Sequence, residues 1–463
     1  MLCTCVFLHL KNGRDAHQRL DHIVVDNANV LIGGQHNSQS SLMERFVIQG
    51  NTRVHGEIAI SGSKNAALPI LAAVLLCDGA TVVDNLPQLQ DVATSLELLG
   101  SLGVELGMAG TRRLEANPRQ VHSLTAPYEL VRKMRASILV LGPMLTRFGE
   151  ANVSFPGGCA IGSRPVDIHL QGLRALGASI EIEDGFIRAT VDGRLHGTTI
   201  CMPMVSVGAT ENLMMAAALA KGTTRLENAA CEPEISDLAN CLNAWGARVT
   251  GAGTQTIVIE GVERMPGGYF RVMPDRIETG TYLAAAAATR GSIRVTDADP
   301  STLEQVLQTL RATGAYVALG ADWISLDMQG RRPLAVDLVT APYPGFPTDM
   351  QAQLTVVNAV ADGVGRVTET IFENRFMQIQ ELRRMGADIV IDANTATVKG
   401  VNRLKGTRVL ASDLRASASL IIAALAADGE TCIDDIHYVD RGYECIEAKL
   451  HQLGAQIIRM TSE

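Results

Sequence analysis

The sequence is poor in aromatic residues and has no block of basic residues. Phe, Trp and Tyr make up 4% of the 463 residues, the formal net charge is −9, and Lys and Arg are scattered along the chain. Nucleic-acid binding needs a concentrated positive surface, and single strands also need aromatic rings on which bases stack. The composition therefore argues against a nucleic-acid partner, and we expect isolated cations to bind small anions at particular points.

Long apolar runs and paired cysteines are also missing. No apolar run reaches the roughly 18 residues that a membrane span needs, so we expect no membrane partner. The nine cysteines are scattered, without a C-x-x-C pair or a cluster with histidine at ligand spacing. We therefore predict a reducing compartment, no disulfide framework and no metal site.

The first 42 residues differ from the rest. The opening MLCTCVFLHL is apolar but short, has no positively charged leader, and runs into polar KNGRDAHQRLDH without a convincing cleavage site. We interpret residues 1–42 as a loosely attached, poorly ordered extension, with Met43 as a candidate second start.

From Glu44 onward one unit recurs six times. Each unit holds an Ala- and Leu-rich helix, a β-branched strand, a second amphipathic helix and a glycine that leads into another strand. The closing glycines lie 68 to 74 residues apart, at Gly103, Gly177, Gly246, Gly314, Gly386 and Gly454. We predict a left-handed turn at each, because glycine adopts it without strain at a helix end. Solenoid units are typically about 20–50 residues long. Six longer units instead favour two α/β groups of three, with a ligand cleft between them.

Cations recur where helices are expected to begin. A helix start offers free backbone N–H groups and a positive dipole end, and guanidinium groups match phosphate and carboxylate. Taken singly, Lys64 is better interpreted as a solvated lysine beside a plain helix cap, and each arginine as a solvated surface charge. Together they suggest one anionic ligand shared by both halves: Lys64 in SGSKN, Arg135 in MRAS, Arg164 in SRPVD, Arg415 in LRASAS and Arg441 in DRGYE.

Two further residues are candidates for catalysis. Cys159 lies in FPGGCAIGSRPVDI, whose proline and glycines predict a loop. A guanidinium nearby, from Arg164, can lower a thiol pKa and make it reactive, although a buried inert cysteine is an equal alternative. Asp349 follows Pro347 at an expected helix start, where it is either an N-cap carboxylate or a general base for a substrate hydroxyl. Position alone does not separate these roles.

Several motifs together resemble those of the bacterial UDP-N-acetylglucosamine enolpyruvyl transferases. They are PGGCAIGSRPVD, APYELVRKMRAS, SGSKNAALPI, FPTDMQAQ, TETIFENRFM, DLRASAS and HYVDRGYE. The resemblance covers essentially Met43 to the C-terminus and leaves residues 1–42 unexplained. It implies two inside-out α/β domains, each of three βαβαββ repeats, with the active site in the interdomain cleft. One domain would comprise residues 64–272 and carry the Cys159 loop, and the other residues 43–63 plus 273–463.

The resemblance also implies a reaction, located in the bacterial cytoplasm. The enolpyruvyl group of phosphoenolpyruvate would pass to the 3′-hydroxyl of UDP-N-acetylglucosamine with release of phosphate, as the first committed step of peptidoglycan precursor synthesis. No cofactor would be needed.

The same resemblance assigns roles to individual residues. Cys159 would donate a proton and be the thiol that fosfomycin alkylates, and Asp349 would be the base. Lys64, counted as catalytic, and Asn65 would contact phosphoenolpyruvate, helped by Arg164 and Arg441. Arg415 would line the same cleft. The nucleotide sugar would be held by Arg135, Arg164, Pro165, Val166, Asp167, Ile168, Val205, Ser206, Val207, Asp349 and Ile371.

Two positions depart from the family pattern. Met204 stands just before VSVGA, where many relatives carry a lysine. Losing that charged hydrogen bond would weaken nucleotide binding by about 1–3 kcal/mol, if nothing replaces it. Cys231 stands before EPEI, where an arginine can occur, and we interpret it as harmless surface variation.

Two other functions compete with this prediction. The related shikimate-pathway transferase shares the fold and phosphoenolpyruvate, but the loop cysteine and the RPVD segment argue against it. A catalytically silent paralogue that binds the sugar nucleotide or a protein is the second alternative. The sequence does not determine the oligomeric state.

Overall fold

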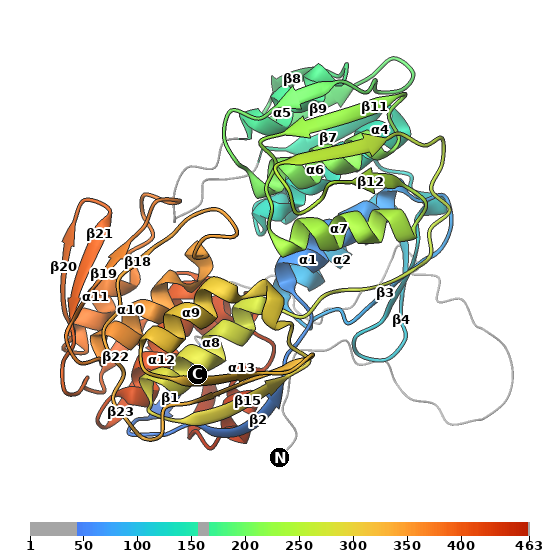
Figure 1. Ribbon diagram of the computed structural model, residues 1–463. Helices are drawn as coiled ribbons and strands as arrows, with labels where there is room; N and C mark the ends of the chain where they lie inside the picture. Colours follow the sequence, from blue (N-terminus) through green and yellow to red (C-terminus); the bar gives the residue numbers. More distant parts are fainter. Residues whose placement is uncertain (1–43, 156–165, 462–463) are drawn as a thin grey trace, which may run out of the picture.

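The computed structural model describes residues 44–155 and 166–461, which form two bodies (Figure 1). The predicted extension at residues 1–42 and the candidate site residues Cys159, Arg164 and Pro165 lie outside the described residues. Buried apolar side chains form two separate clusters. We call the body whose core comes from residues 66–272 the first domain. The second domain has its core in residues 46–60 and 277–457.

Each domain contains three four-stranded sheets with the same strand pattern. In each sheet two strands pair in parallel, and the next two strands join them in antiparallel fashion. The sheets of the first domain are β14 (Tyr269–Arg271), β3 (Thr81–Asp84), β5 (Leu114–Asn117) and β4 (Glu105–Met108); β6 (Thr125–Ala126), β7 (Glu150–Ser154), β9 (Phe186–Thr190) and β8 (Ser179–Glu183); and β10 (Thr199–Cys201), β11 (Thr223–Glu227), β13 (Thr256–Glu260) and β12 (Arg248–Thr250).

The second domain repeats this arrangement. Its sheets are β2 (His55–Ala59), β15 (Ser292–Thr296), β17 (Trp323–Asp327) and β16 (Tyr316–Leu319); β18 (Leu338–Val339), β19 (Val364–Thr368), β21 (Thr395–Lys399) and β20 (Asp388–Asp392); and β22 (Arg408–Leu410), β23 (Glu430–Asp434), β1 (Glu44–Gln49) and β24 (Ile457–Thr461). The six predicted units are therefore confirmed, and so is the two-domain α/β fold.

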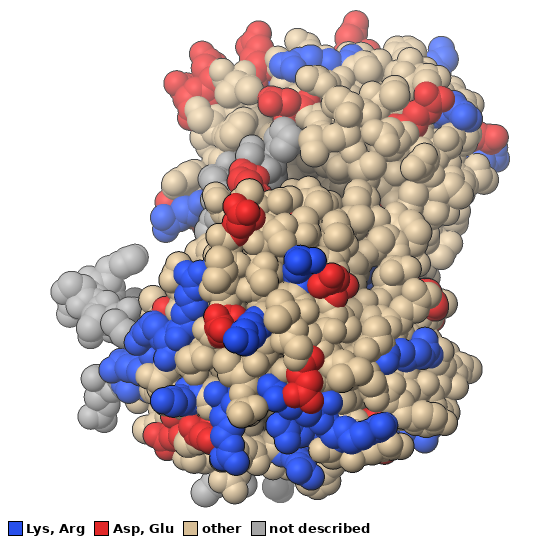
Figure 2. All heavy atoms as spheres, turned by 60° about the vertical axis from the view of Figure 1, so that its left-hand side comes forward, with Lys and Arg blue, Asp and Glu red and all other residues tan. Residues whose placement is uncertain are grey.

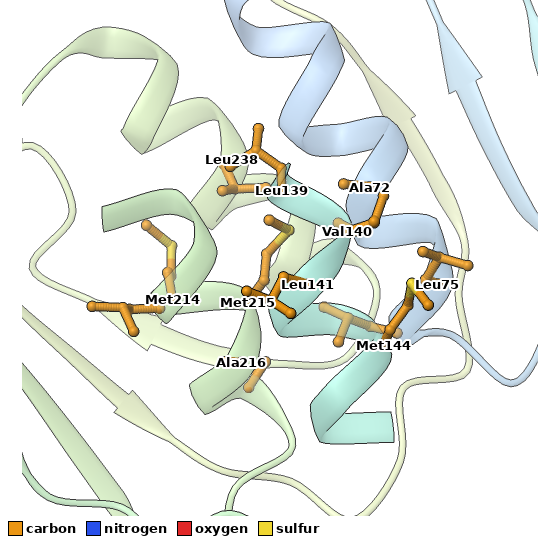
Figure 3. Packing of buried hydrophobic residues seen from close by; sticks show 14 of the residues in the cluster. Ala72, Leu75, Leu139, Val140, Leu141, Met144, Met214, Met215, Ala216 and Leu238 are labelled. Atoms are coloured by element: carbon orange, nitrogen blue, oxygen red, sulfur yellow. The ribbon is translucent and has the colours of Figure 1, made fainter. Parts of the chain in front are cut away.

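The helices that open the units fill the two cores. They are α1 (Lys64–Ala73), α4 (Leu141–Phe148), α6 (Val207–Ala218), α8 (Arg276–Ala288), α10 (Gln351–Ala359) and α12 (Leu414–Ala426). Small residues all round such helices, as in the buried run 284–288, let them pack closely inside the domain. Figure 3 shows side chains of α1, α4, α6 and α7 converging in the first domain. The sheets lie outside these helices, and their strands alternate buried and exposed residues.

The second helices of the units end at the predicted glycines. They are α2 (Gln90–Leu102), α5 (Asp167–Ala175), α7 (Pro233–Ala244), α9 (Glu304–Ala312), α11 (Gln378–Arg384) and α13 (Ile446–Gln452). All six closing glycines have positive φ, between 85° and 109°, so the predicted left-handed turns are confirmed. The short helices are α3 (Tyr128–Val131), η1 (Val74–Leu76), η2 (Pro118–Gln120), η3 (Arg135–Val140), η4 (Pro300–Thr302), η5 (Thr348–Met350) and η6 (Ile436–Arg441).

The chain passes between the domains twice. β1 pairs with β23 and β24, and β2 pairs with β15, so the first described strands lie in sheets of the second domain (Figure 1). The chain then enters the first domain at α1 and returns after β14. The two crossing segments are hydrogen-bonded to each other, from Ser63 N to Met273 O at 2.7 Å and from Asp275 N to Ser61 O at 2.9 Å.

A single carboxylate joins the two helices that begin at this crossing. Asp275 caps α8 by accepting hydrogen bonds from the N–H groups of Ile277 and Glu278, and it also accepts one from Lys64 N at the start of α1. The starts of α1 and α8, one from each domain, therefore lie side by side.

Charged side chains of both signs share the surface. On the face in Figure 2, Lys and Arg gather over the second domain, with Asp and Glu among them. Within residues 44–155 and 166–461, no helix has the length and apolar character that crossing a membrane requires. The same residues include no group of three or more His, Cys, Asp or Glu side chains arranged to hold a metal ion.

Candidate active site

Lys64 is buried at the start of α1. Ser63 caps this helix by accepting a hydrogen bond from Ala66 N, and Lys64 follows it. The ammonium group lies 3.1 Å from a carboxylate oxygen of Asp91, and only 8% of Lys64 is exposed. The alternative of a solvated lysine is therefore wrong. The next residue, Asn65, donates from Nδ2 to Asp349 Oδ2 at 3.4 Å, across the domain boundary.

Asp91 joins cations from both domains. It lies in the first turn of α2, in the first domain, and is 3% exposed. Besides Lys64 it accepts hydrogen bonds from Arg441 of η6, in the second domain, at 2.9 Å from Nε and 3.4 Å from Nη2. Lys64 and Arg441 are thus held on either side of one buried carboxylate.

Asp349 holds two arginines of its own domain. It lies in η5, immediately before α10, but α10 has no side-chain cap, so the N-cap alternative is wrong. The carboxylate accepts instead from Arg375 Nη2 at 2.7 Å and from Arg415 Nη2 and Nε at 3.0 and 3.3 Å. Both arginines are almost fully buried.

Local structure places Arg415 for this contact. Asp413 caps α12 by accepting hydrogen bonds from the N–H groups of Arg415 and Ala416. The guanidinium also donates from Nη1 to the hydroxyl of Tyr443 at 3.2 Å, and that hydroxyl lies 3.0 Å from Thr281 Oγ1. Arg415 therefore has one preferred direction, toward Asp349.

The charges around this boundary do not cancel. Four cations, at Lys64, Arg375, Arg415 and Arg441, face the carboxylates of Asp91 and Asp349 and the nearby carboxylate of Asp275, which leaves a surplus of one positive charge among these groups. A surplus of this kind favours an anion with phosphate or carboxylate groups.

The same charges perturb the pKa values of the groups they surround. Burial lowers the pKa of Lys64, and the charges of Arg415 and Arg441 lower it further, against the opposing effect of Asp91. Burial alone would raise the pKa of Asp349, but Arg415 and Arg375 outweigh it and hold that pKa well below its ordinary value.

Ile371 is tied to the same region by Glu369. One oxygen of this buried carboxylate accepts from Ile371 N at 2.7 Å, and the other accepts from Thr348 Oγ1 at 2.7 Å. Thr348 in turn accepts from Arg375 Nη1 at 2.8 Å. A continuous chain of hydrogen bonds therefore links Ile371 to the guanidinium that contacts Asp349.

A second group of predicted residues lies within the first domain. Val166 immediately precedes α5, which starts with Asp167 and buried Ile168, and Ser206, between Val205 and Val207, caps α6. Arg135 begins η3. His169 lies among them, with its Nδ1 at 3.1 Å from Asn212 Nδ2. Burial, helped by the charge of Arg135, lowers the pKa of His169 to about 4, so the imidazole is neutral at pH 7.

The structure thus gathers the predicted residues in two groups. Lys64, Asn65, Asp349, Arg415 and Arg441 are directly connected at the domain boundary. Of the remaining described candidates, Ile371 is linked to this group through Glu369, Thr348 and Arg375, and the others lie near the starts of α5, α6 and η3. Met204, at the first departure from the family pattern, is 53% exposed, and Cys231, at the second, is partly exposed.

Sequence reasoning missed four polar residues that organise these groups. Arg375 lies within the quoted motif TETIFENRFM, so that motif could have revealed it. Asp91, His169 and Asn212 had no comparable signal, because an acid in a first helical turn and buried polar residues in helices are common.

Comparisons with known proteins identify a matching family and similar sequences. Residues 48–450 match the family model described as EPSP synthase (3-phosphoshikimate 1-carboxyvinyltransferase). The chain is 61% identical to the UDP-N-acetylglucosamine 1-carboxyvinyltransferase of Cellvibrio japonicus, covering 91% of this chain and 100% of the relative. It is 60% identical to the protein of that name from Halorhodospira halophila, over 90% of this chain and 100% of the relative.

Solved structures are similar as well. The enolpyruvyl transferase NikO from Streptomyces tendae has a TM-score of 0.82 at 25% identity, covering 91% of this chain and 100% of that protein. The EPSP synthase of Acinetobacter baumannii, at 17% identity and a TM-score of 0.69, covers 90% of this chain and 100% of that protein and supports the fold alone.

Proposed function

The chain belongs to the 1-carboxyvinyltransferase (enolpyruvyl transferase) family, and on that premise we propose its reaction and the residues that carry it. It transfers the enolpyruvyl group of phosphoenolpyruvate to the 3′-hydroxyl of UDP-N-acetylglucosamine and releases phosphate. This is the first committed step of peptidoglycan precursor synthesis, and we assign it to the bacterial cytoplasm. The functional domains are residues 64–272 and residues 43–63 plus 273–463.

The observation that carries the proposal is the surplus of positive charge where the two domains meet. Phosphoenolpyruvate has a phosphate and a carboxylate, and each needs cationic partners. Lys64 and Arg441, from different domains, suit one of these groups, and Arg375 and Arg415 suit the other. Because neither domain supplies the whole set, the substrate binds only where both are in contact.

Asp349 is the base for the 3′-hydroxyl, and substrate binding prepares it for this role. Arg415 and Arg375 keep the pKa of Asp349 low, which makes this carboxylate a weak proton acceptor. An anionic substrate on these guanidinium groups offsets their field, so the pKa of Asp349 rises toward a useful value. Asn65, which donates to the same carboxylate, helps to orient it.

Cys159 donates a proton to the methylene carbon of phosphoenolpyruvate while the sugar oxygen bonds to the neighbouring carbon. Loss of a proton from that methyl group and departure of phosphate then restore the double bond. Arg164 assists with phosphoenolpyruvate. These two roles rest on the family resemblance, because both residues lie outside the described residues.

The nucleotide sugar lies along the second group of residues in the first domain. Arg135 supplies a positive charge, and the starts of α5 and α6 supply backbone N–H groups near Val166, Asp167, Ile168, Val205, Ser206 and Val207, next to Pro165. Ile371 reaches the sugar from the second domain.

Phosphate release from phosphoenolpyruvate tests the proposal, with UDP-N-acetylglucosamine or shikimate 3-phosphate as acceptor. We expect turnover only with the nucleotide sugar, and loss of turnover in Cys159→Ala and after fosfomycin treatment. Cys201→Ala, which removes an exposed thiol elsewhere, is the matched control and stays active. A folded wild type that binds the nucleotide sugar without turnover would instead support the silent paralogue.

A further inference from the structure

Residues 441–444 of the second domain contact the first domain directly. Arg441 ends η6 and points to Asp91. Three residues later, the carboxylate of Glu444 accepts a hydrogen bond from Arg112 Nη2 at 2.9 Å and another from Gln88 N at 3.3 Å. Both partners of Glu444 belong to the first domain, so this segment joins the two domains at two points.

Glu444 is part of a built contact. It is 7% exposed, and its two partners come from loops that are themselves joined. Leu86 N donates to Arg112 O at 2.9 Å, and Gln88 Nε2 donates to Thr111 O at 3.0 Å. Gln88 lies just before α2, whose first turn carries Asp91. The Glu444 carboxylate is therefore hydrogen-bonded to the loop that positions Asp91, the partner of Arg441.

The segment is also held firmly in its own domain. Tyr443 is buried, and its hydroxyl contacts Arg415 and Thr281. At Gly442 an added Cβ would lie 2.7 Å from the side chain of Leu414, so this backbone packs tightly against the start of α12. The segment therefore moves with the second domain, and Glu444 fixes it to the first.

We propose that Glu444 is a positioning residue for Arg441. By binding Arg112 and Gln88 N, it keeps the second domain against the loop before α2, so that Arg441 stays beside Asp91 and Lys64. This rests on the proposed function, in which Arg441 binds phosphoenolpyruvate. Glu444 does not touch the substrate, and its loss therefore affects binding of phosphoenolpyruvate more than binding of the nucleotide sugar or the chemical step.

The test is steady-state phosphate release by the full chain, with Glu444→Gln and Arg112→Ala alone and combined. We expect the KM for phosphoenolpyruvate to rise about tenfold in each, the effect of losing one charged hydrogen bond. The KM for the nucleotide sugar and kcat change less than about threefold. The double variant is no worse than either single one, because both remove the same contact. Arg225→Ala, which breaks the exposed pair with Glu227 in the first domain, is the matched control and changes none of these values.

Hydrogen exchange gives a second readout that does not need turnover. The amide of Gln88 exchanges faster in Glu444→Ala than in the wild type, because it loses its acceptor. An unchanged KM for phosphoenolpyruvate in Glu444→Gln would overturn the proposal, as would equal rises in both KM values with a lower melting temperature. An inactive wild type would overturn the proposed function and with it the role of Arg441, while exchange at Gln88 would still decide whether Glu444 joins the domains.

Discussion

Replacing Asp349 by Asn removes the carboxylate that balances two buried guanidinium groups. The side chains of Arg415 and Arg375 are 4% and 8% exposed. Breaking a buried ion pair leaves its partner charged and unpaired, which costs about 3–5 kcal/mol. For a domain of about 200 residues, this lowers the melting temperature by about 10 °C. Turnover falls by about 10²–10⁴, the usual contribution of a general base.

Thermal melting with and without inorganic phosphate is the assay. The variant has one more uncompensated positive charge than the wild type, so the same phosphate concentration raises its melting temperature by more. Asp84→Asn is the matched control, because Asp84 pairs with Arg271 and Tyr269 at the surface. That change costs less than about 1 kcal/mol and leaves turnover intact.

Either of two results would refute this reasoning. An Asp349→Asn protein with the same melting temperature as the wild type would show that the carboxylate does not balance the charges of the guanidinium groups. Turnover close to that of the wild type would show that another group accepts the proton.

Three further predictions concern stability. Burial raises the pKa of Asp237 from 3.8 to about 7, so the folded protein keeps a proton that the unfolded chain has lost, and wild-type stability falls as pH rises from about 4 to 7. Asp237→Asn lacks this loss, so urea unfolding should show it to be more stable than the wild type by about 2–4 kcal/mol at pH 8.5, by less at pH 5, and by nothing near pH 3.5. The pKa of His169 is lowered to about 4 in the folded protein. Between about pH 6.5 and pH 4 the imidazole is therefore protonated in the unfolded chain but neutral in the folded protein, so stability falls as the pH is lowered through that window. His169→Gln should flatten the resulting fall in stability across that window in calorimetry, by up to about 3 kcal/mol, whereas exposed His122→Gln should not. An alanine Cβ at Gly62 would lie 1.8 Å from Asn85 O, so Gly62→Ala costs about 1–3 kcal/mol or more in urea unfolding, while Gly107→Ala, which has open space, costs little.

Local chemistry explains why the repeats were predictable. Each closing glycine has a positive φ, which other residues adopt only with strain. The same position of every unit therefore requires glycine, and this recurrence is visible in the sequence. The boundaries of the two domains are still a prediction, because no local rule determines which of two neighbouring cores a connecting segment joins.

The site was predictable only in part, because its contacts are not local. Lys64 and Asp349 were recognisable as candidates, but the sequence also allowed a solvated lysine and an N-cap carboxylate. Only their buried charged partners, which are distant in the sequence, exclude these alternatives. Asp91 and Arg441 are 350 residues apart, and Glu444 meets Gln88 across a similar interval. No spacing rule predicts such pairs. The roles of Cys159 and Arg164 also remain predictions.

The pairing of β1 with β23 and β24 affects how the protein is made. A ribosome adds about 5–20 residues per second, so Gln49 waits about 20–80 s for Glu430, its partner 381 residues later. During that time β1 remains without its sheet, whereas β2 can pair as soon as β15 has been made. A circular permutant that moves residues 44–63 behind residue 461 would remove this delay. We expect the β1 sheet of this permutant to form sooner after its strands are made and, in cells, the permutant to depend less on chaperones.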